Sequence, residues 1–262
     1  MHSFVHEIDS VKNYSFRFSI CTLVTNQEEY NEMVNSFKQA GFDEKFCEYI
    51  FIDNSKKNKY DAYKGINRFL SAAQGEYIII CHQDVLLNFD KIDKLQKCIE
   101  EMNQKDPDWA LLGNAGGVHY KRNASKIANG AGKIHEEGPL PAQVSSLDEN
   151  FILAKKDANL SLSHDLKGFH LYGTDICLIA RVIGYKAYVI DFLLTHKSYG
   201  NADRTFYDLR NLFIKKYKSA FKGIFIQTTI TKFFISGSSL KSSIYNTRLV
   251  QKLANLYWKA TK

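Results

Sequence analysis

The feature that most constrains the fold is a regular alternation of short apolar runs and amphipathic segments in the first 115 residues. The apolar runs are nearly continuous, which predicts buried strands at residues 18–25, 48–52, 77–81 and 110–114. Helical spacing of apolar residues lies between them, ending near Gly41 and over residues 60–73 and 92–102. This order predicts an α/β fold with a mostly parallel sheet covered by helices.

The second half of the chain has a less regular pattern. Residues 113–138 are rich in Gly, Asn and Ala without periodicity, and we expect loops over a site there. Residues 175–184 predict a helix with Thr174 or Asp175 as its N-cap, and residues 187–192 predict a further strand that leads to Thr195 and His196.

Charge divides the chain into two predicted parts. The net charge is +7, yet residues 204–262 hold 12 Lys or Arg and one acid, so residues 1–203 are mildly acidic. We therefore predict an α/β catalytic domain at 1–203 and a basic, mainly helical extension at 204–262. The extension either packs its aromatic face on the domain or contacts an anionic membrane surface. Nucleic-acid binding is not expected, because no aromatic and basic RNA motif is present.

The location follows from two further patterns. No apolar run approaches the roughly 20 residues that span a bilayer, and the first residues lack the design of a signal peptide. The five cysteines are widely spaced without a CxxC pair, which predicts buried, reduced thiols. We expect a cytoplasmic protein, with peripheral contact at the inner face of the membrane as the alternative that the basic extension leaves open.

Polar residues follow three of the predicted strands. They are Thr25-Asn26, Asp53-Asn54-Ser55 and His82-Gln83-Asp84, and the carboxyl ends of parallel strands meet at one edge of a sheet. A carboxylate such as Asp84 is a suitable ligand for Mg²⁺ or Mn²⁺, although an Asp after a strand is also an ordinary loop residue. Neither GxGxxG nor GxxxxGK[ST] is present, which counts against dinucleotide oxidoreductases and P-loop enzymes.

Several segments, in their order, resemble the GT-A glycosyltransferases of family 2, and more narrowly the StrF-like branch of streptomycin biosynthesis. They are ICTLVTN, YIFIDNS, AAQGEYIIICHQDV, SLDENFILAKKD, FHLYGTDICLIARVIGYKAYVID and THKSYG, between residues 18 and 200. The resemblance implies a GT-A, Rossmann-like sheet and inverting transfer of a sugar from a nucleotide-diphosphate sugar to an acceptor hydroxyl. It further implies a Mn²⁺ or Mg²⁺ cofactor and a saccharide or lipid-linked acceptor, in surface polysaccharide or glycoconjugate synthesis.

The resemblance also implies roles for the donor side. Residues Thr22, Val24 and Asn26 match the positions that hold the nucleotide, and Asp53 matches the acid that hydrogen-bonds the base. The triplet His82-Gln83-Asp84 matches the DxD motif on the nucleotide-sugar, with Asp84 on the metal and His82 beside the ribose or metal-bound water.

The remaining roles concern the acceptor and the metal shell. Asp175 matches the general base on the acceptor hydroxyl, with a helix N-cap as its structural alternative. His196 matches a histidine that completes the metal shell, although a histidine after a strand is often only hydrogen-bonded. Asp148, His170 and Tyr172 are expected on the acceptor side.

The sequence departs from the family pattern at two positions. His82 stands where the motif has Asp, and Thr174 stands where Glu is commoner. Two alternatives therefore stay open. One is a nucleotidyltransferase of similar architecture, although the polar run after the first strand is not the expected Gly-rich basic loop. The other is a catalytically inactive relative that binds sugar nucleotides.

Overall fold

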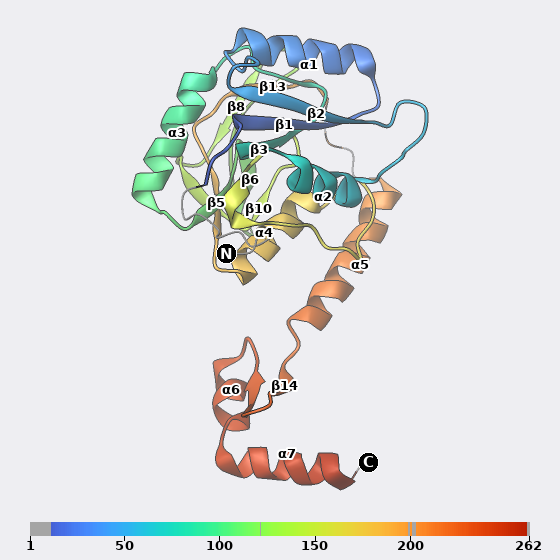
Figure 1. The fold of residues 1–262 in the computed structure, drawn as a ribbon, viewed down its shortest axis with the longest axis vertical. Helices are drawn as coiled ribbons and strands as arrows, with labels where there is room; N and C mark the ends of the chain where they lie inside the picture. Colours follow the sequence, from blue (N-terminus) through green and yellow to red (C-terminus); the bar gives the residue numbers. More distant parts are fainter. Residues whose placement is uncertain (1–11, 121, 199, 201–202, 261–262) are drawn as a thin grey trace, which may run out of the picture. The chain divides into compact units, whose positions relative to one another are not determined.

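A computed structural model describes residues 12–120, 122–198, 200 and 203–260. By its internal contacts the chain divides into two compact units, Met1–Leu209 and Arg210–Lys262, which are described separately. The ribbon is shown in Figure 1.

The first unit is built on a seven-stranded sheet in the order β2-β1-β3-β11-β5-β12-β9. Five of these strands run in one direction, while β11 and β9 run against them. The strands are β1 (Phe16–Val24), β2 (Cys47–Asp53), β3 (Gly75–Cys81), β5 (Trp109–Gly113), β9 (Ala142–Val144), β11 (Phe151–Lys155) and β12 (Lys186–Val189). The predicted α/β class with a mostly parallel sheet flanked by helices is confirmed.

Four helices cover the two faces of this sheet (Figure 1): α1 (Gln27–Gln39), α2 (Ala62–Ala72), α3 (Ile92–Lys105) and α4 (Tyr172–Val182). The apolar sides of α1 and α3 share one buried core with alternate residues of β1 and β3, such as Phe18, Ile20 and Ile79. Helix α2 lies on the other face, where its Gly65 is close to the side chains of Leu23 and Ile52. Because strand side chains alternate between faces, this assigns Thr22 and Val24 to one side of the sheet and Leu23 to the other.

A second sheet occupies the region that was expected to be loops. It has the order β10-β6-β7-β13-β4, with β8 paired to β7. Its strands are β4 (Val85–Leu86), β6 (Ala115–His119), β7 (Arg122–Asn129), β8 (Ile134–Glu137), β10 (Ser146–Leu147) and β13 (Leu194–His196). The loop prediction for residues 113–138 was wrong because short Gly and Ala side chains give these strands no apolar periodicity, while Gly116 allows the close approach of Ser146.

Helix α4 begins three residues earlier than predicted. The N-cap position is Leu171, with a left-handed backbone (φ 61°) and no side-chain cap. The prediction of Thr174 or Asp175 as N-cap was therefore wrong: Asp175 lies within the first turn. A short 3₁₀ helix spans Lys156–Ala158. All five cysteines are free and buried, as predicted.

The second unit combines helices with a small hairpin. Helix α5 (Arg204–Ala220) leads into it, and strands β14 (Ile224–Gln227) and β15 (Lys232–Ile235) pair antiparallel. Helices α6 (Ser239–Tyr245) and α7 (Arg248–Ala260) follow. The helical C-terminal extension is confirmed, but the hairpin was not predicted. Within the described residues, we find no helix with the length and apolar character that crossing a membrane requires.

Candidate active site

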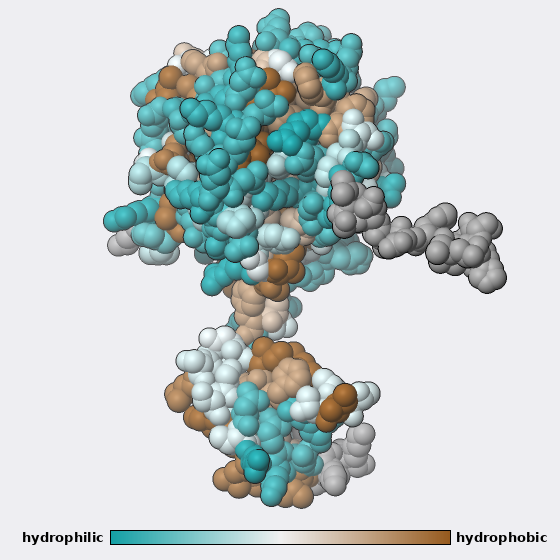
Figure 2. Space-filling model, turned by 60° about the vertical axis from the view of Figure 1, so that its left-hand side comes forward, coloured by the Kyte–Doolittle hydropathy of each residue, from teal (hydrophilic) through white to brown (hydrophobic). Residues whose placement is uncertain are grey.

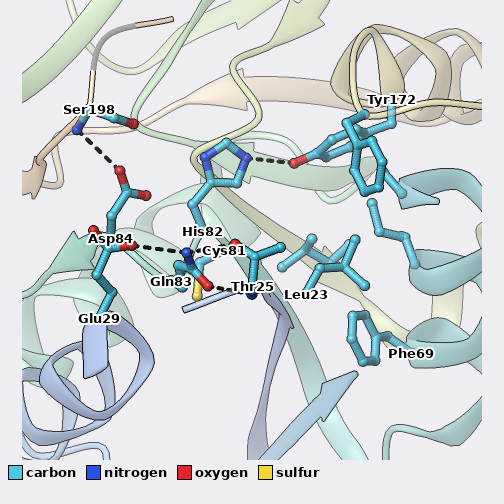
Figure 3. A pocket seen from close by; sticks show the side chains of 14 residues that line it. Leu23, Thr25, Glu29, Phe69, Cys81, His82, Gln83, Asp84, Tyr172 and Ser198 are labelled. Atoms are coloured by element: carbon cyan, nitrogen blue, oxygen red, sulfur yellow. Dashed lines mark hydrogen bonds between the residues drawn. The ribbon is translucent and has the colours of Figure 1, made fainter. Parts of the chain in front are cut away.

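A cavity of about 370 Å³ lies at the carboxyl ends of β1 and β3 (Figure 3). One part of its wall is apolar and comes from Leu23, Ile80 and the α2 side chains Ile66 and Phe69. The opposite part is polar and includes all of His82-Gln83-Asp84. Among the described residues that line the cavity there is no Lys or Arg.

Strand pairing brings His196 against His82 and Asp84, although His196 is not itself among the residues that line the cavity. The triplet leads directly into β4, and β13 pairs antiparallel with β4 so that His196 lies opposite Val85. The imidazole nitrogen His196 Nε2 is therefore 3.4 Å from Asp84 Oδ1 and 3.3 Å from His82 Nδ1. One ligand atom from each of His82, Asp84 and His196 lies within 4.8 Å of the others, an arrangement that can hold a metal ion.

The carboxylate of Asp84 is held in a fixed orientation. Its Oδ2 accepts a hydrogen bond from the backbone N–H of Ser198 at 3.1 Å (Figure 3). Its Oδ1 lies 3.4 Å from Nε2 of His196. Burial acts to raise the pKa of Asp84, but hydrogen bonds from His196 and Ser198 outweigh it and hold the pKa well below the ordinary value. Asp84 is therefore ionised at neutral pH, as a metal ligand must be.

A hydrogen-bond chain fixes the tautomer of His82. The Tyr172 hydroxyl donates to the Glu149 carbonyl oxygen at 3.0 Å and lies 2.9 Å from His82 Nε2. Since the single hydroxyl proton is used on Glu149, Nε2 of His82 must donate to Tyr172, and Nδ1 keeps its lone pair toward His196. Burial lowers the pKa of His82, which keeps the ring neutral. An imidazole oriented from behind in this way is typical of metal ligands.

Gln83 ties the triplet to the start of α1. Its side-chain oxygen accepts hydrogen bonds from the backbone N–H groups of Thr25 and Asn26 at 2.8 and 3.0 Å, and its amide donates to Glu29. Gln83 therefore positions the turn after β1, while its neighbours His82 and Asp84 belong to the cluster that could hold a metal ion.

The remaining residues predicted on the donor side are not all directed into the cavity. Thr22 and Val24 are buried on the α1 side of the sheet, and Leu23 and Thr25 line the cavity in their place. The side chain of Asn26 caps α1.

Asp53 lies at the end of β2 and accepts two hydrogen bonds from Ser55, one from its backbone N–H and one from its hydroxyl. These hydrogen bonds lower the pKa of Asp53. It is not among the residues lining the cavity.

The residues predicted on the acceptor side are also dispersed. Tyr172 lines the cavity, whereas Asp148 lies on a separate depression beside β6 and β10. The ring of His170 packs edge-on against Phe206, and the neighbouring Phe169 contributes to the cavity wall.

Asp175 is not brought to the cavity. It is fully buried, and its two oxygens accept hydrogen bonds of 2.7 Å from the backbone N–H and the hydroxyl of Ser163. These contacts tie α4 to the segment before it, so the structure places Asp175 in a supporting position.

Glu149 is the carboxyl group that the sequence reasoning missed. It is partly exposed, and its Oε1 accepts a hydrogen bond from the backbone N–H of Gly173 at the start of α4. Burial raises the pKa of Glu149 to about 8, against the opposing effect of the Gly173 N–H. The sequence placed Glu149 only within Asp148-Glu149-Asn150, a segment that resembles the acceptor side of the family, with a turn before a strand as the alternative. Its contact with α4 joins residues far apart in the chain.

Comparison with known proteins gives one sequence relative. Over 212 residues the chain is 35% identical to ATP synthase subunits region ORF 6 of Fuscovulum blasticum, a match that covers 79% of this chain and 85% of that protein. The chain belongs to the family of ORF 6. The name of ORF 6 describes an open reading frame and states no activity. No model of a described family matches the chain.

Two solved structures show weak similarity to this chain. A197 from STIV has a TM-score of 0.40 at 12% identity and covers 72% of this chain and 97% of its own. GalNAc-T7, crystallised with UDP, GalNAc and Mn²⁺, has a TM-score of 0.46 at 9% identity and covers 72% of this chain and 45% of its own. These TM-scores are too low to assign a role to any residue of the site.

Proposed function

We propose that this protein is a metal-dependent glycosyltransferase that moves a sugar from a nucleotide-diphosphate sugar to an acceptor hydroxyl, with inversion. The observation that carries the proposal is the cluster of His82, Asp84 and His196 at the polar end of a cavity that is otherwise apolar. An apolar wall suits the flat faces of a base or sugar, and a cation at the other end suits a diphosphate. The sequence resemblance to family 2 supports the same assignment.

The donor set favours Mn²⁺ over Mg²⁺. Two imidazole nitrogens and one carboxylate oxygen are available, whereas Mg²⁺ is usually bound by oxygen atoms and keeps several waters. When bound, the cation would neutralise the negative charge that develops on the diphosphate leaving group. No Lys or Arg among the described lining residues could neutralise that charge in place of the cation.

We propose Glu149 as the general base in place of the predicted Asp175. Both oxygens of Asp175 are engaged by Ser163 in a fully buried position. Glu149 is partly exposed and contacts the start of α4. It is not among the described residues that line the cavity, but its backbone carbonyl bonds Tyr172, which does line it. A raised pKa near the working pH is what an efficient general base requires.

The proposed transfer step uses the metal site and the general base Glu149. The acceptor oxygen attacks the anomeric carbon as the bond from that carbon to the diphosphate oxygen breaks, and the acceptor proton passes to the carboxylate of Glu149. The Tyr172 hydroxyl holds His82 on one side and Glu149 on the other, so the donor and acceptor ends are kept in fixed relation. Attack from the face opposite the leaving group inverts the anomeric configuration.

The donor site is tested by thermal denaturation with UDP-, GDP-, dTDP- and CMP-sugars, with Mn²⁺, with Mg²⁺ or without metal. A ligand at a hundredfold excess over its Kd stabilises the folded state by about 2.7 kcal/mol. That corresponds to a rise in Tm of about 5–10 °C for a unit of this size. We expect such a rise with one nucleotide diphosphate and Mn²⁺, and its loss in Asp84→Asn. If no nucleotide shifts the Tm under any condition, the proposed function is wrong.

The base is tested by paired variants once a donor is known. Glu149→Gln should bind the donor with unchanged affinity and lose at least about 10²-fold in transfer rate. Asp175→Asn keeps an oxygen for Ser163 and should keep transfer wherever it remains folded. The opposite result, with Glu149→Gln active and Asp175→Asn folded but inactive, would return the role to Asp175.

A further inference from the structure

The C-terminal unit, Arg210–Lys262, is basic throughout. It contains eleven Lys or Arg and no Asp or Glu. No acidic side chain within the unit can therefore neutralise its positive charge. A surface of this kind attracts an anionic partner.

The unit buries little of its apolar surface. Its hairpin is held by ring contacts among Phe225, Phe234 and Tyr245, with centroids 4.7–5.8 Å apart. Asn246 fastens α6 to β15 by bonding both the N–H and the carbonyl of Phe234. Between residues 218 and 257 no described side chain is buried. Apolar side chains are visible on the surface of this unit in Figure 2.

Helix α7 presents its leucines outward. Leu249, Leu253 and Leu256 are 67%, 56% and 64% exposed, and their spacing of four and three residues places them on one stripe. Two polar side chains of the helix contact the rest of the unit: Gln251 donates to the Tyr245 carbonyl at 2.7 Å, and Asn255 accepts a hydrogen bond from Lys232. Arg248 and Lys252 of the same helix are exposed. An amphipathic helix ordinarily buries its apolar stripe, whereas the leucine stripe of α7 is not covered by the described residues.

We propose that the unit Arg210–Lys262 binds the surface of an anionic lipid bilayer, with the leucine stripe of α7 at the boundary of headgroups and acyl chains. Helices with an apolar stripe and basic residues lie in that plane, and each basic residue near the surface adds to binding. Leu240 and Ile244 of α6 are also exposed, at 69% and 48%, and supply a second apolar group.

The charge of the unit favours a bilayer over two other partners. A second copy would bring another eleven basic residues without acids against the first, which opposes pairing through this unit. Nucleic acid would satisfy the positive charge, but its phosphate backbone would leave a stripe of exposed leucines in water. An anionic bilayer accommodates both features at once.

Co-sedimentation of the full chain with vesicles tests the proposal. Phosphatidylcholine vesicles are compared with vesicles in which a third of the lipid is phosphatidylglycerol, at low and high salt. We expect binding to the anionic vesicles only, weakened by salt. Replacing Leu249, Leu253 and Leu256 together by Gln should weaken it by about tenfold for each leucine.

A lysine variant tests the contribution of charge to vesicle binding, and a second variant serves as the control. Lys241→Gln combined with Lys252→Gln should weaken binding by about fivefold for each lysine. The matched control is Val182→Gln, since Val182 is as exposed as Leu249 but lies on α4 of the first unit, and it should bind vesicles like the parent chain. Circular dichroism confirms that every variant keeps its helices.

Three outcomes would overturn the proposal. The first is the absence of binding to anionic vesicles. The second is vesicle or DNA binding that depends on the lysines and is unchanged by the leucine substitutions, which would assign the unit to nucleic acid or to nonspecific charge. The third is a dimer in light scattering that the leucine substitutions abolish, which would show that a second copy covers the stripe. None of these results bears on the sugar-nucleotide cavity.

Discussion

Replacing Glu149 by Gln should make the protein more stable at alkaline pH. Burial raises the pKa of Glu149 in the folded chain to about 8, from an ordinary value of 4.5. Between these two values the folded state binds more protons than the unfolded state, so the free energy of unfolding falls as pH rises. Gln has the same shape, keeps an oxygen for the N–H of Gly173 and cannot ionise.

The pKa shift of Glu149 sets the size of the change in the free energy of unfolding. One pKa unit corresponds to about 1.4 kcal/mol, so the free energy of unfolding should fall by on the order of 3–5 kcal/mol between pH 4.5 and pH 8. Glu149→Gln should therefore match the parent protein near pH 5 and exceed it by a few kcal/mol above pH 8. Glu100→Gln, on the exposed side of α3, is the matched control for the same substitution at a surface position.

Urea unfolding at a series of pH values measures this difference. Trp109 is fully buried in the first unit, and replacing Trp258 by Phe in all proteins leaves Trp109 as the sole tryptophan reporter. Other titrating groups cancel in the comparison, His82 among them. The reasoning is refuted if Glu149→Gln is less stable than the parent above pH 8, because the carboxylate would then be an ionised cap for α4 with a lowered pKa.

Three further variants test the surroundings of the cavity. Asp175→Ala should reduce the free energy of unfolding by about 2–4 kcal/mol in urea titrations, because it leaves two buried donors of Ser163 without an acceptor. Gly173→Ala should be destabilised by about 1–3 kcal/mol in the same assay, since a Cβ there would overlap the Leu147 carbonyl oxygen. Tyr172→Phe should weaken Mn²⁺ binding by about 10–100-fold in calorimetric titration, because it removes the hydroxyl that orients the imidazole of His82. Unchanged affinity would argue against the metal site.

The sheet of the first unit could be predicted because burial on both faces leaves nearly continuous apolar runs. The runs around Ile20, Ile79 and Leu112 all became central strands. The second sheet could not be found in this way. Its strands β6 and β7 are held by backbone pairing and by the small size of Gly116, and neither property leaves a hydrophobic period in the sequence.

In the candidate site, too, local sequence order predicted some residues, whereas others depend on contacts between distant segments. Asp84 could be found because it follows a predicted strand, and its place at the sheet edge comes from local order. The approach of His196 depends on the pairing of β13 with β4, and the contact of Glu149 with Gly173 spans 24 residues. Side chains also alternate between the two faces of β1. Leu23 therefore faces the cavity, and Thr22, which was predicted to hold the nucleotide, does not.

The histidine that departs from the DxD pattern is best understood through its partner across the cavity. A carboxylate at position 82 would meet the Tyr172 hydroxyl, whose proton is already given to the Glu149 carbonyl, and two acceptors would face each other without a donor. An imidazole supplies that missing proton from Nε2 and keeps a lone pair on Nδ1 for the metal side. His82 and Tyr172 therefore fit as a pair, and the chain they form connects the proposed metal ligand to the segment that carries the proposed base.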